Sequence, residues 1–297
     1  MMNPIYDDIR RLAQVIPLEE LYLNADVQQV LADYLLHCHQ TRNAAREHTE
    51  ILDRFKRLAA NRPTQPEQSP TAGEMSGLVD CWSGIVRRVS NLGTPPSASV
   101  TNKWWKRLVD AYTEPHRRYH NLVHIINVIR AVDTLIGSWT TPAISPADRD
   151  LILIAAWFHD VVYDPKRNNN EAESAEVARQ FLVDILRHDL IDTIVSLVMA
   201  TSYPSAVPAN NMAPIMRDAD LSPLAFPRTA FMADARDIRQ EYAHLSDEEW
   251  LKGRLAFGQM LLDQPQIYAT EFGRQQWEPI ARANLGEMVH TLSGGSK

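Results

Sequence analysis

The sequence is organised around an apolar stretch that ends in a histidine and an aspartate, Leu151-Ile152-Leu153-Ile154-Ala155-Ala156-Trp157-Phe158-His159-Asp160. A capping box with proline at the first helical position, Ser145-Pro146-Ala147-Asp148, precedes it and predicts a helix that runs to about His159. A charged carboxylate at the edge of a core costs several kcal/mol unless it is paired or bound to a metal. A bound ion explains Asp160 more simply than a helix-end histidine followed by a capping aspartate does, so the stretch predicts a metal site.

A second histidine-bearing stretch lies upstream, Tyr119-His120-Asn121-Leu122-Val123-His124. The apolar residues that follow at helical spacing predict one helix over residues 119–136. On that helix His120 and His124 differ by only about 40° around the axis, so both can face one site. The alternative is that one or both are surface or capping histidines, which is the commoner role for a lone pair at this spacing.

A downstream carboxylate completes the candidate set, in Arg217-Asp218-Ala219-Asp220-Leu221. Either aspartate could cap a helix. Asp220 is the first candidate ligand because it directly precedes Leu221 and Leu224 at the expected edge of the core, and Asp218 is the second. Imidazole and carboxylate groups suit the harder divalent first-row ions and require no thiolate.

Composition limits the classes of function. The chain of 297 residues has a formal net charge of -7, which argues against a general binder of nucleic-acid polymers. A small anionic substrate would need a local cluster of arginine or metal. The two cysteines, Cys38 and Cys81, form no disulfide framework and indicate a reducing cytoplasm. The N-terminus is acidic, unlike a signal peptide, and the longest apolar run, residues 151–158, is far shorter than a membrane span. We therefore expect a soluble cytoplasmic protein without a membrane partner.

The chain divides at two breaks rich in proline, serine and glycine, over residues 62–73 and 93–97, and we place the domain boundary at about residue 98. Residues 1–97 contain predicted helices over 5–60 and a short apolar segment over 78–89, and we assign them no function. A long helix with a thin apolar stripe needs a partner, so the N-terminal helices are candidates for a homodimer interface.

The second domain, residues 98–297, reads as a succession of helices. They are expected over residues 104–112, 119–136, 145–159, 170–185, 191–199, 227–244, 246–262 and 276–292. The helix from 246 begins with a second capping box, Ser246-Asp247-Glu248-Glu249. No stretch shows the alternation and hairpin turns of strands, so the predicted fold class is all-α.

Residues from about 104 to 290 resemble the HD-domain superfamily of metal-dependent phosphohydrolases, in particular its bacterial branch of predicted HD superfamily hydrolases. The resemblance is carried by residues 114–125, 157–165, 170–175 and 218–222, with shorter matches at 238–242, 253–254, 267–268 and 281–285. It implies a helical bundle on which His124, His159, Asp160 and Asp220 hold a divalent metal ion such as Mn, Fe, Co, Ni or Mg. The Tyr-His-Asn-x-x-His arrangement is also distantly similar to the cyclic-nucleotide phosphodiesterases, in which the histidine matching His120 protonates the leaving oxygen.

The function that the resemblance implies is metal-dependent hydrolysis of a small phosphate ester, a nucleotide above all, with His120 and Asp160 as catalytic residues. Arg117, Asn121 and Arg254 are candidate substrate-binding residues, since guanidinium pairs with phosphate in a bidentate fork. The alternative for Arg254 is a surface pair with Glu248 or Glu249.

Two other functions stay open. One is a catalytically weak HD-type module for ligand sensing or protein binding. The other, diiron oxygenation, is disfavoured because His188 is the only histidine between Asp160 and Asp220. Asp164 and Glu171 are the candidates for contacts to a second metal.

Overall fold

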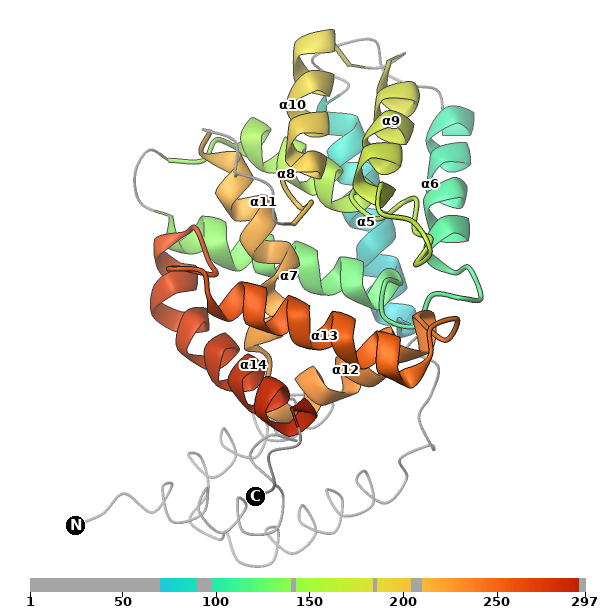
Figure 1. Ribbon diagram of the computed structural model, residues 1–297. Helices are drawn as coiled ribbons and strands as arrows, with labels where there is room; N and C mark the ends of the chain where they lie inside the picture. Colours follow the sequence, from blue (N-terminus) through green and yellow to red (C-terminus); the bar gives the residue numbers. More distant parts are fainter. Residues whose placement is uncertain (1–69, 90–97, 140–142, 184–185, 204–209, 294–297) are drawn as a thin grey trace, which may run out of the picture. The chain divides into compact units, whose positions relative to one another are not determined.

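The computed structural model describes residues 70–89, 98–139, 143–183, 186–203 and 210–293 (Figure 1). Apart from the short segment 227–230, these residues belong to one compact unit, which spans residues 67–226 and 231–297. The helices expected over residues 5–60, most of the first linker and Cys38 lie outside the described residues. None of the described helices is both long and apolar enough to cross a membrane.

The described residues are helical throughout and include no strand, which confirms the all-α prediction. The elements are α5 (Ala72–Val89), α6 (Ala98–Tyr112), α7 (Leu122–Ser138), α8 (Pro146–Phe158), α9 (Asn170–Leu182), α10 (His188–Met199), α11 (Met212–Asp220), the 3-10 turn η2 (Ser222–Ala225), α12 (Arg228–Glu241), α13 (Asp247–Leu262), the π-helical turn η3 (Gly273–Trp277) and α14 (Glu278–Leu292). Each helix expected after residue 104 has a counterpart among them.

Helix α8 forms the centre of the main core. Its capping box is present as predicted, because the Ser145 and Asp148 side chains each accept a hydrogen bond from the other's backbone N–H. Residues 150–158 are all buried, and α5, α7, α9, α10 and α11 pack around them. Figure 1 shows α9 and α10 side by side over this helix. Because α8 is enclosed, it delivers the His159-Asp160 pair directly into the interior.

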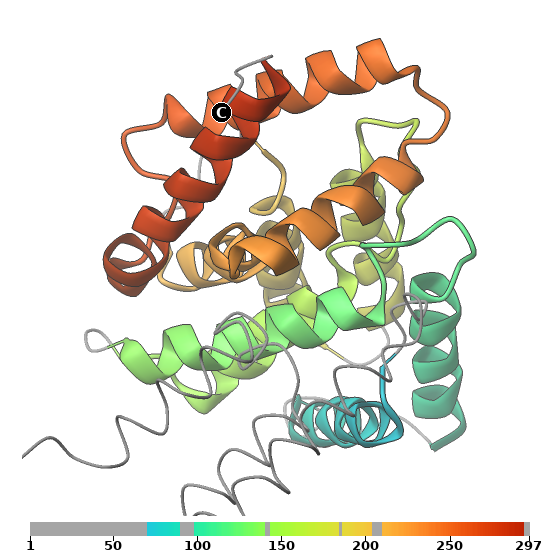
Figure 2. The same ribbon diagram turned by 90° about the horizontal axis from the view of Figure 1, so that it is seen from below.

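The C-terminal helices build a second, smaller apolar cluster. It contains Leu224 of η2, Phe231 of α12, Leu261 of α13 and Leu285 of α14. Figure 2 shows these helices, drawn in orange and red, on the opposite side of α7 from α5. Helix α7 therefore lies between the two clusters, with its N-terminal end available to both.

The start of α7 differs from the prediction. The helix begins at Leu122, because the side chain of Asn121 accepts a hydrogen bond from the N–H of Val123 and acts as the N-cap. His120 therefore precedes the helix, and the expectation that His120 and His124 share one helix was wrong.

Helix α5 lies before the predicted boundary at residue 98, yet it packs into the main core. Trp82 is 2% exposed, and its ring centroid lies 5.9 Å from that of Trp157. Arg88 donates two hydrogen bonds of 2.7 Å to the buried Asp150 of α8. The boundary stays a prediction, and any functional unit that excludes α5 has to account for this shared core.

Candidate metal centre and active site

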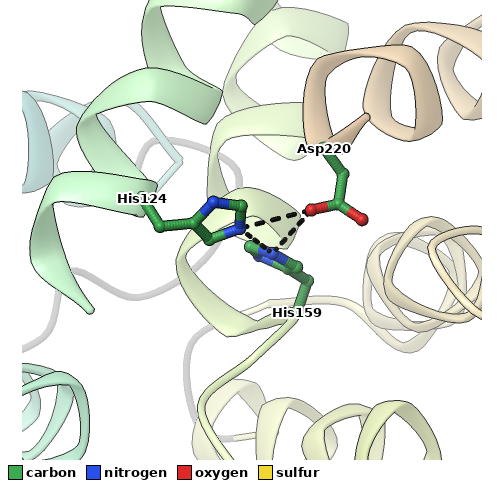
Figure 3. Close-up of side chains that lie close together, drawn as sticks. All are labelled: His124, His159 and Asp220. Carbon is green, nitrogen blue, oxygen red and sulfur yellow. Dashed lines mark hydrogen bonds and ion pairs between the residues drawn. The ribbon is translucent and has the colours of Figure 1, made fainter. Parts of the chain in front are cut away.

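Three side chains from three helices converge at the end of α8. Figure 3 shows His124 of α7, His159 at the C-cap of α8 and Asp220 at the end of α11 pointing toward one another. The two Nε2 atoms of His124 and His159 are 3.1 Å apart, and Asp220 Oδ1 is 3.3 Å from each of them. One ligand atom from each residue lies within 4.8 Å of the others, which is a spacing that one metal ion could span.

Asp160 adds a second carboxylate to this cluster. Its Oδ2 lies 3.1 Å from Nε2 of His159 and 3.6 Å from Nε2 of His124. The turn that carries it is fixed by Arg117, which donates hydrogen bonds to the backbone oxygens of Asp160 and Val161. All four residues predicted as metal ligands are therefore brought together, and their role as ligands stays a prediction.

The chemistry of the four side chains fits a divalent cation. His159 Nδ1 is 2.9 Å from the carbonyl oxygen of Ala156, so Nδ1 donates there and Nε2 is the nitrogen that faces the cluster. Two imidazole nitrogens and two carboxylate oxygens at this separation repel one another unless a positive charge lies among them. A divalent first-row ion accepts such a mixed set of ligands.

The pKa shifts within the cluster also indicate that its two carboxylates attract positive charge. Burial opposes protonation of His159, but the charge and hydrogen bond of Asp160, together with Asp220, raise the pKa of His159 well above its ordinary value. Burial would raise the pKa of Asp220, but hydrogen bonds to His124 and His159 lower it to about 2. The pKa of Asp160 is lowered further, because the charge of His159 outweighs the effect of burial. Both carboxyl groups are therefore ionised at neutral pH.

His120 lies next to this cluster and is held by a buried glutamate. Its Nδ1 is 2.6 Å from Oε2 of Glu241, the last residue of α12. The other oxygen of Glu241 accepts hydrogen bonds from the backbone N–H groups of Arg118, Tyr119 and His120, and Oε2 also accepts one from the Tyr163 hydroxyl. Burial would raise the pKa of Glu241, but the charge and hydrogen bond of His120 lower it to about 2. The ionised Glu241 thus keeps a proton on Nδ1 of His120.

Two aromatic rings fix the orientation of the His120 imidazole. The Tyr163 ring stacks on it at a centroid distance of 4.1 Å, and the Tyr119 ring contacts it edge to face at 4.8 Å. Burial lowers the pKa of His120, but the charge and hydrogen bond of Glu241 outweigh burial and raise it. The site therefore favours the protonated form of the ring, and Nε2 is the nitrogen that can give a proton to a bound molecule.

Sequence reasoning missed Glu241. The sequence assigned it no role in the site, yet Glu241 is buried, and its neighbour Arg239 pairs with Asp247 at 2.7 Å. No local pattern links Glu241 to His120, since the two are 121 residues apart in the chain. The resemblance at residues 238–242 was the one signal that pointed to this segment.

A cavity of about 850 Å³ opens beside these groups, and its lining includes His120, Asp160 and Asp220. Of the three candidate substrate-binding residues, Arg254 borders the cavity. Arg117 instead donates to Glu114 and to backbone oxygens, and Asn121 caps α7. In these positions Arg117 and Asn121 hold the turn at His120 and the end of α8.

Asp218, the second candidate for the downstream ligand, serves a structural role. It is fully buried, and its carboxylate accepts hydrogen bonds from the backbone N–H groups of Ala269 and Thr270. Gly273 lies so close that an added Cβ would be 2.8 Å from Asp218 Oδ2. Asp218 therefore anchors the segment before α14, which leaves Asp220 as the aspartate at the cluster.

The comparisons with known proteins agree with the helical architecture. A search of solved structures finds the crystal structure of the phosphodiesterase domain of the RhoPDE fusion protein from the choanoflagellate Salpingoeca rosetta. The match has a TM-score of 0.50 and 15% sequence identity, and it covers 81% of this chain and 95% of that chain. No protein-family model and no curated protein sequence matches this chain. The chain is therefore similar in fold to a phosphodiesterase domain.

Proposed function

We propose that this protein is a metal-dependent phosphohydrolase that acts on a small phosphate ester, most directly a nucleotide. The observation that carries the proposal is that one cavity is bordered both by Asp160 and Asp220, the two carboxylates of the cluster with His124 and His159, and by the paired His120. The fold likeness to a phosphodiesterase domain supports hydrolysis of a phosphate ester as the general reaction.

In the proposed mechanism the four residues of the cluster would hold a divalent ion. When bound, such an ion lowers the pKa of a water molecule and polarises a phosphoryl oxygen. His120 donates the proton on Nε2 to the ester oxygen, so that the alcohol leaves neutral as its bond to phosphorus breaks. Glu241 keeps the Nδ1 proton in place and stabilises the imidazolium before the transfer. The oxygen of the attacking water forms the new bond to phosphorus, and the proton that this water loses restores the protonated imidazole of His120.

The test is release of phosphate from a panel of nucleotides and other phosphate esters, with added manganese. Wild-type protein is compared with Asp160→Ala and His120→Gln, and with a matched change of the exposed Asp80 of α5 to alanine. We expect Asp160→Ala to lose both bound metal and phosphate release. His120→Gln should keep its metal and lose about 10²- to 10⁴-fold in rate, because it lacks the general acid.

Each outcome discriminates between the functions considered. Phosphate release by Asp160→Ala at the wild-type rate would refute the proposed role of the cluster. Bound metal without hydrolysis of any compound in the panel would favour a ligand-sensing or protein-binding module. The Asp80→Ala variant should match the wild type, because that side chain is exposed and far along the sequence from the cluster.

A further inference from the structure

The cavity continues from the His120 side into a region between α12 and α13 whose wall has a different character. There the lining is provided by Phe231, Asp234 and Ile238 of α12 and by Trp250, Arg254 and Phe257 of α13. Most of these side chains are aromatic or aliphatic, and a surface of this kind binds the apolar part of a ligand. Asp234 and Arg254 are the two charged residues of this lining, and they restrict the polar groups that a ligand can place there.

Asp234 and Arg254 each contain an enclosed polar atom that lacks a partner. Oδ2 of Asp234 and Nε of Arg254 are buried and form no hydrogen bond within the described structure. The guanidinium of Arg254 lies against aromatic rings, 5.4 Å from the Phe257 centroid and 6.0 Å from that of Trp250. Because buried polar groups in native proteins are nearly always hydrogen-bonded, and because both side chains border the cavity, a molecule in the cavity is the natural source of the missing partners.

The pKa shifts of the two side chains are consistent with a site in which a bound molecule pairs the enclosed polar atoms. Burial, followed by the nearby charge of Asp237, raises the pKa of Asp234 to about 7, although Arg254 acts in the opposite direction. Burial also lowers the pKa of Arg254, partly offset by Tyr119, Tyr242 and Asp234. The two groups are therefore near enough to influence each other, yet no hydrogen bond between them satisfies the enclosed atoms.

The chemistry of the pair discriminates between the groups that this region could bind. A phosphate placed beside Arg254 would also meet the carboxyl group of Asp234, which ionises near pH 7 and then repels a second negative charge. An aliphatic group would leave both polar atoms unpaired at a cost. A planar ring with an N–H donor next to a carbonyl acceptor satisfies both atoms and packs on the aromatic wall. Guanine, hypoxanthine, uracil and thymine present this edge, and the two purines among them offer the larger ring surface to the aromatic wall. Adenine instead presents an amino donor next to an unprotonated ring nitrogen.

We propose that Asp234 and Arg254 select a substrate with a guanine-type ring, whose N–H group donates to Asp234 and whose carbonyl oxygen accepts from Arg254. The inference rests on the proposed function, since the ring is the part of a nucleotide that extends away from the reacting phosphate. It gives Arg254 a role in ring recognition instead of the phosphate contact expected from the sequence.

The test measures binding of free nucleosides to the full-length protein by titration calorimetry, which requires no hydrolysis. Guanosine and inosine should bind the wild type about tenfold or more tightly than adenosine, because adenosine leaves the two polar atoms unpaired. Asp234→Asn should reduce this preference to about threefold or less. Arg254→Lys keeps the charge but loses the planar fork, so it should also lose the preference.

The controls are Glu248→Gln and Lys252→Gln, which change exposed charged residues of α13 and should keep the wild-type preference. Thermal unfolding of each variant shows whether it is folded, and the two site variants provide independent readouts. Equal affinities for guanosine and adenosine in the wild type, or no nucleoside binding, would overturn the inference, as would an unchanged preference in both site variants. Selective binding without hydrolysis would refute the proposed function alone, and hydrolysis without selectivity would refute the ring assignment alone.

Discussion

Glu241→Gln removes the charge that faces His120 and keeps the size of the side chain. The pKa of Glu241 is lowered from 4.5 to about 2 in the folded protein. Each pKa unit corresponds to about 1.4 kcal/mol, so ionised Glu241 stabilises the fold by about 3 kcal/mol at neutral pH. The Gln side chain can still accept the three backbone N–H groups at one oxygen, but its amide cannot provide the negative charge. We therefore expect the free energy of unfolding to fall by about 3 kcal/mol at pH 7.

The stability difference has a defined dependence on pH. Because the folded pKa of Glu241 is depressed, its contribution is present above pH 4.5 and is lost as the pH falls toward about 2. The pKa of His120 is raised, so the contribution of the same pair also declines when the pH rises through that higher value and the imidazole becomes neutral. The difference between wild type and variant should therefore be largest between these limits.

Urea unfolding followed by tryptophan fluorescence measures this difference. All seven tryptophans lie at or after Trp82, so the signal reports on the compact unit that contains the site. Glu248→Gln provides the matched control, because it removes the same charge from an exposed position of α13. A destabilisation below about 1 kcal/mol at pH 7, or a difference that grows as the pH falls from 4.5 toward about 2, would refute the reasoning.

Three further changes test the packing and the cavity. Trp82→Ala should lower the free energy of unfolding by about 3–5 kcal/mol in urea titrations, because Trp82 is 2% exposed and packs on the end of α8; a small effect would place α5 outside the core. In Asp234→Asn, stability relative to the wild type should rise by up to about 4 kcal/mol as the pH rises from about 4 to 7. The reason is that burial holds a proton on folded Asp234, whereas the unfolded chain releases this proton from pH 3.8 upward. A pH-independent difference in thermal unfolding would contradict this. Gly258→Ala should cost about 1–3 kcal/mol, because an added Cβ would lie 2.8 Å from Cγ2 of the stiff Val289 side chain as well as 2.8 Å from Met288 Cε. The control Gly253→Ala meets nothing within 4 Å and should not destabilise.

The helices and the ligand cluster could be predicted because their signals are local. The capping boxes at Ser145 and Ser246 start α8 and α13 where expected. The apolar run of α8 indicated burial on all sides, and a histidine and an aspartate at the end of such a helix had to face the interior. The resemblance then supplied the partners at His124 and Asp220, which the structure brings to the same place.

What sequence reasoning missed depends on contacts between distant segments. An exposed glutamate and a buried one look the same in a helical pattern, so Glu241 could be recognised only once α12 is packed against the turn at His120. Asp234 is hidden for the same reason. The start of α7 was misplaced because helical periodicity extends through Tyr119, whereas the side chain of Asn121 competes for the first free N–H and sets the boundary.

Helix α12 carries both Asp234 and Glu241, about two turns apart and on nearly the same face. A helix of this length moves as a rigid body, so the proposed contact of Asp234 with a ring and the orientation of His120 by Glu241 both depend on the position of α12. Any sequence change that slides or tilts α12 to admit a different ring also displaces the carboxylate that orients His120. Under the proposed roles of Asp234 and Glu241, a movement of α12 that alters substrate preference should therefore also alter proton transfer by His120.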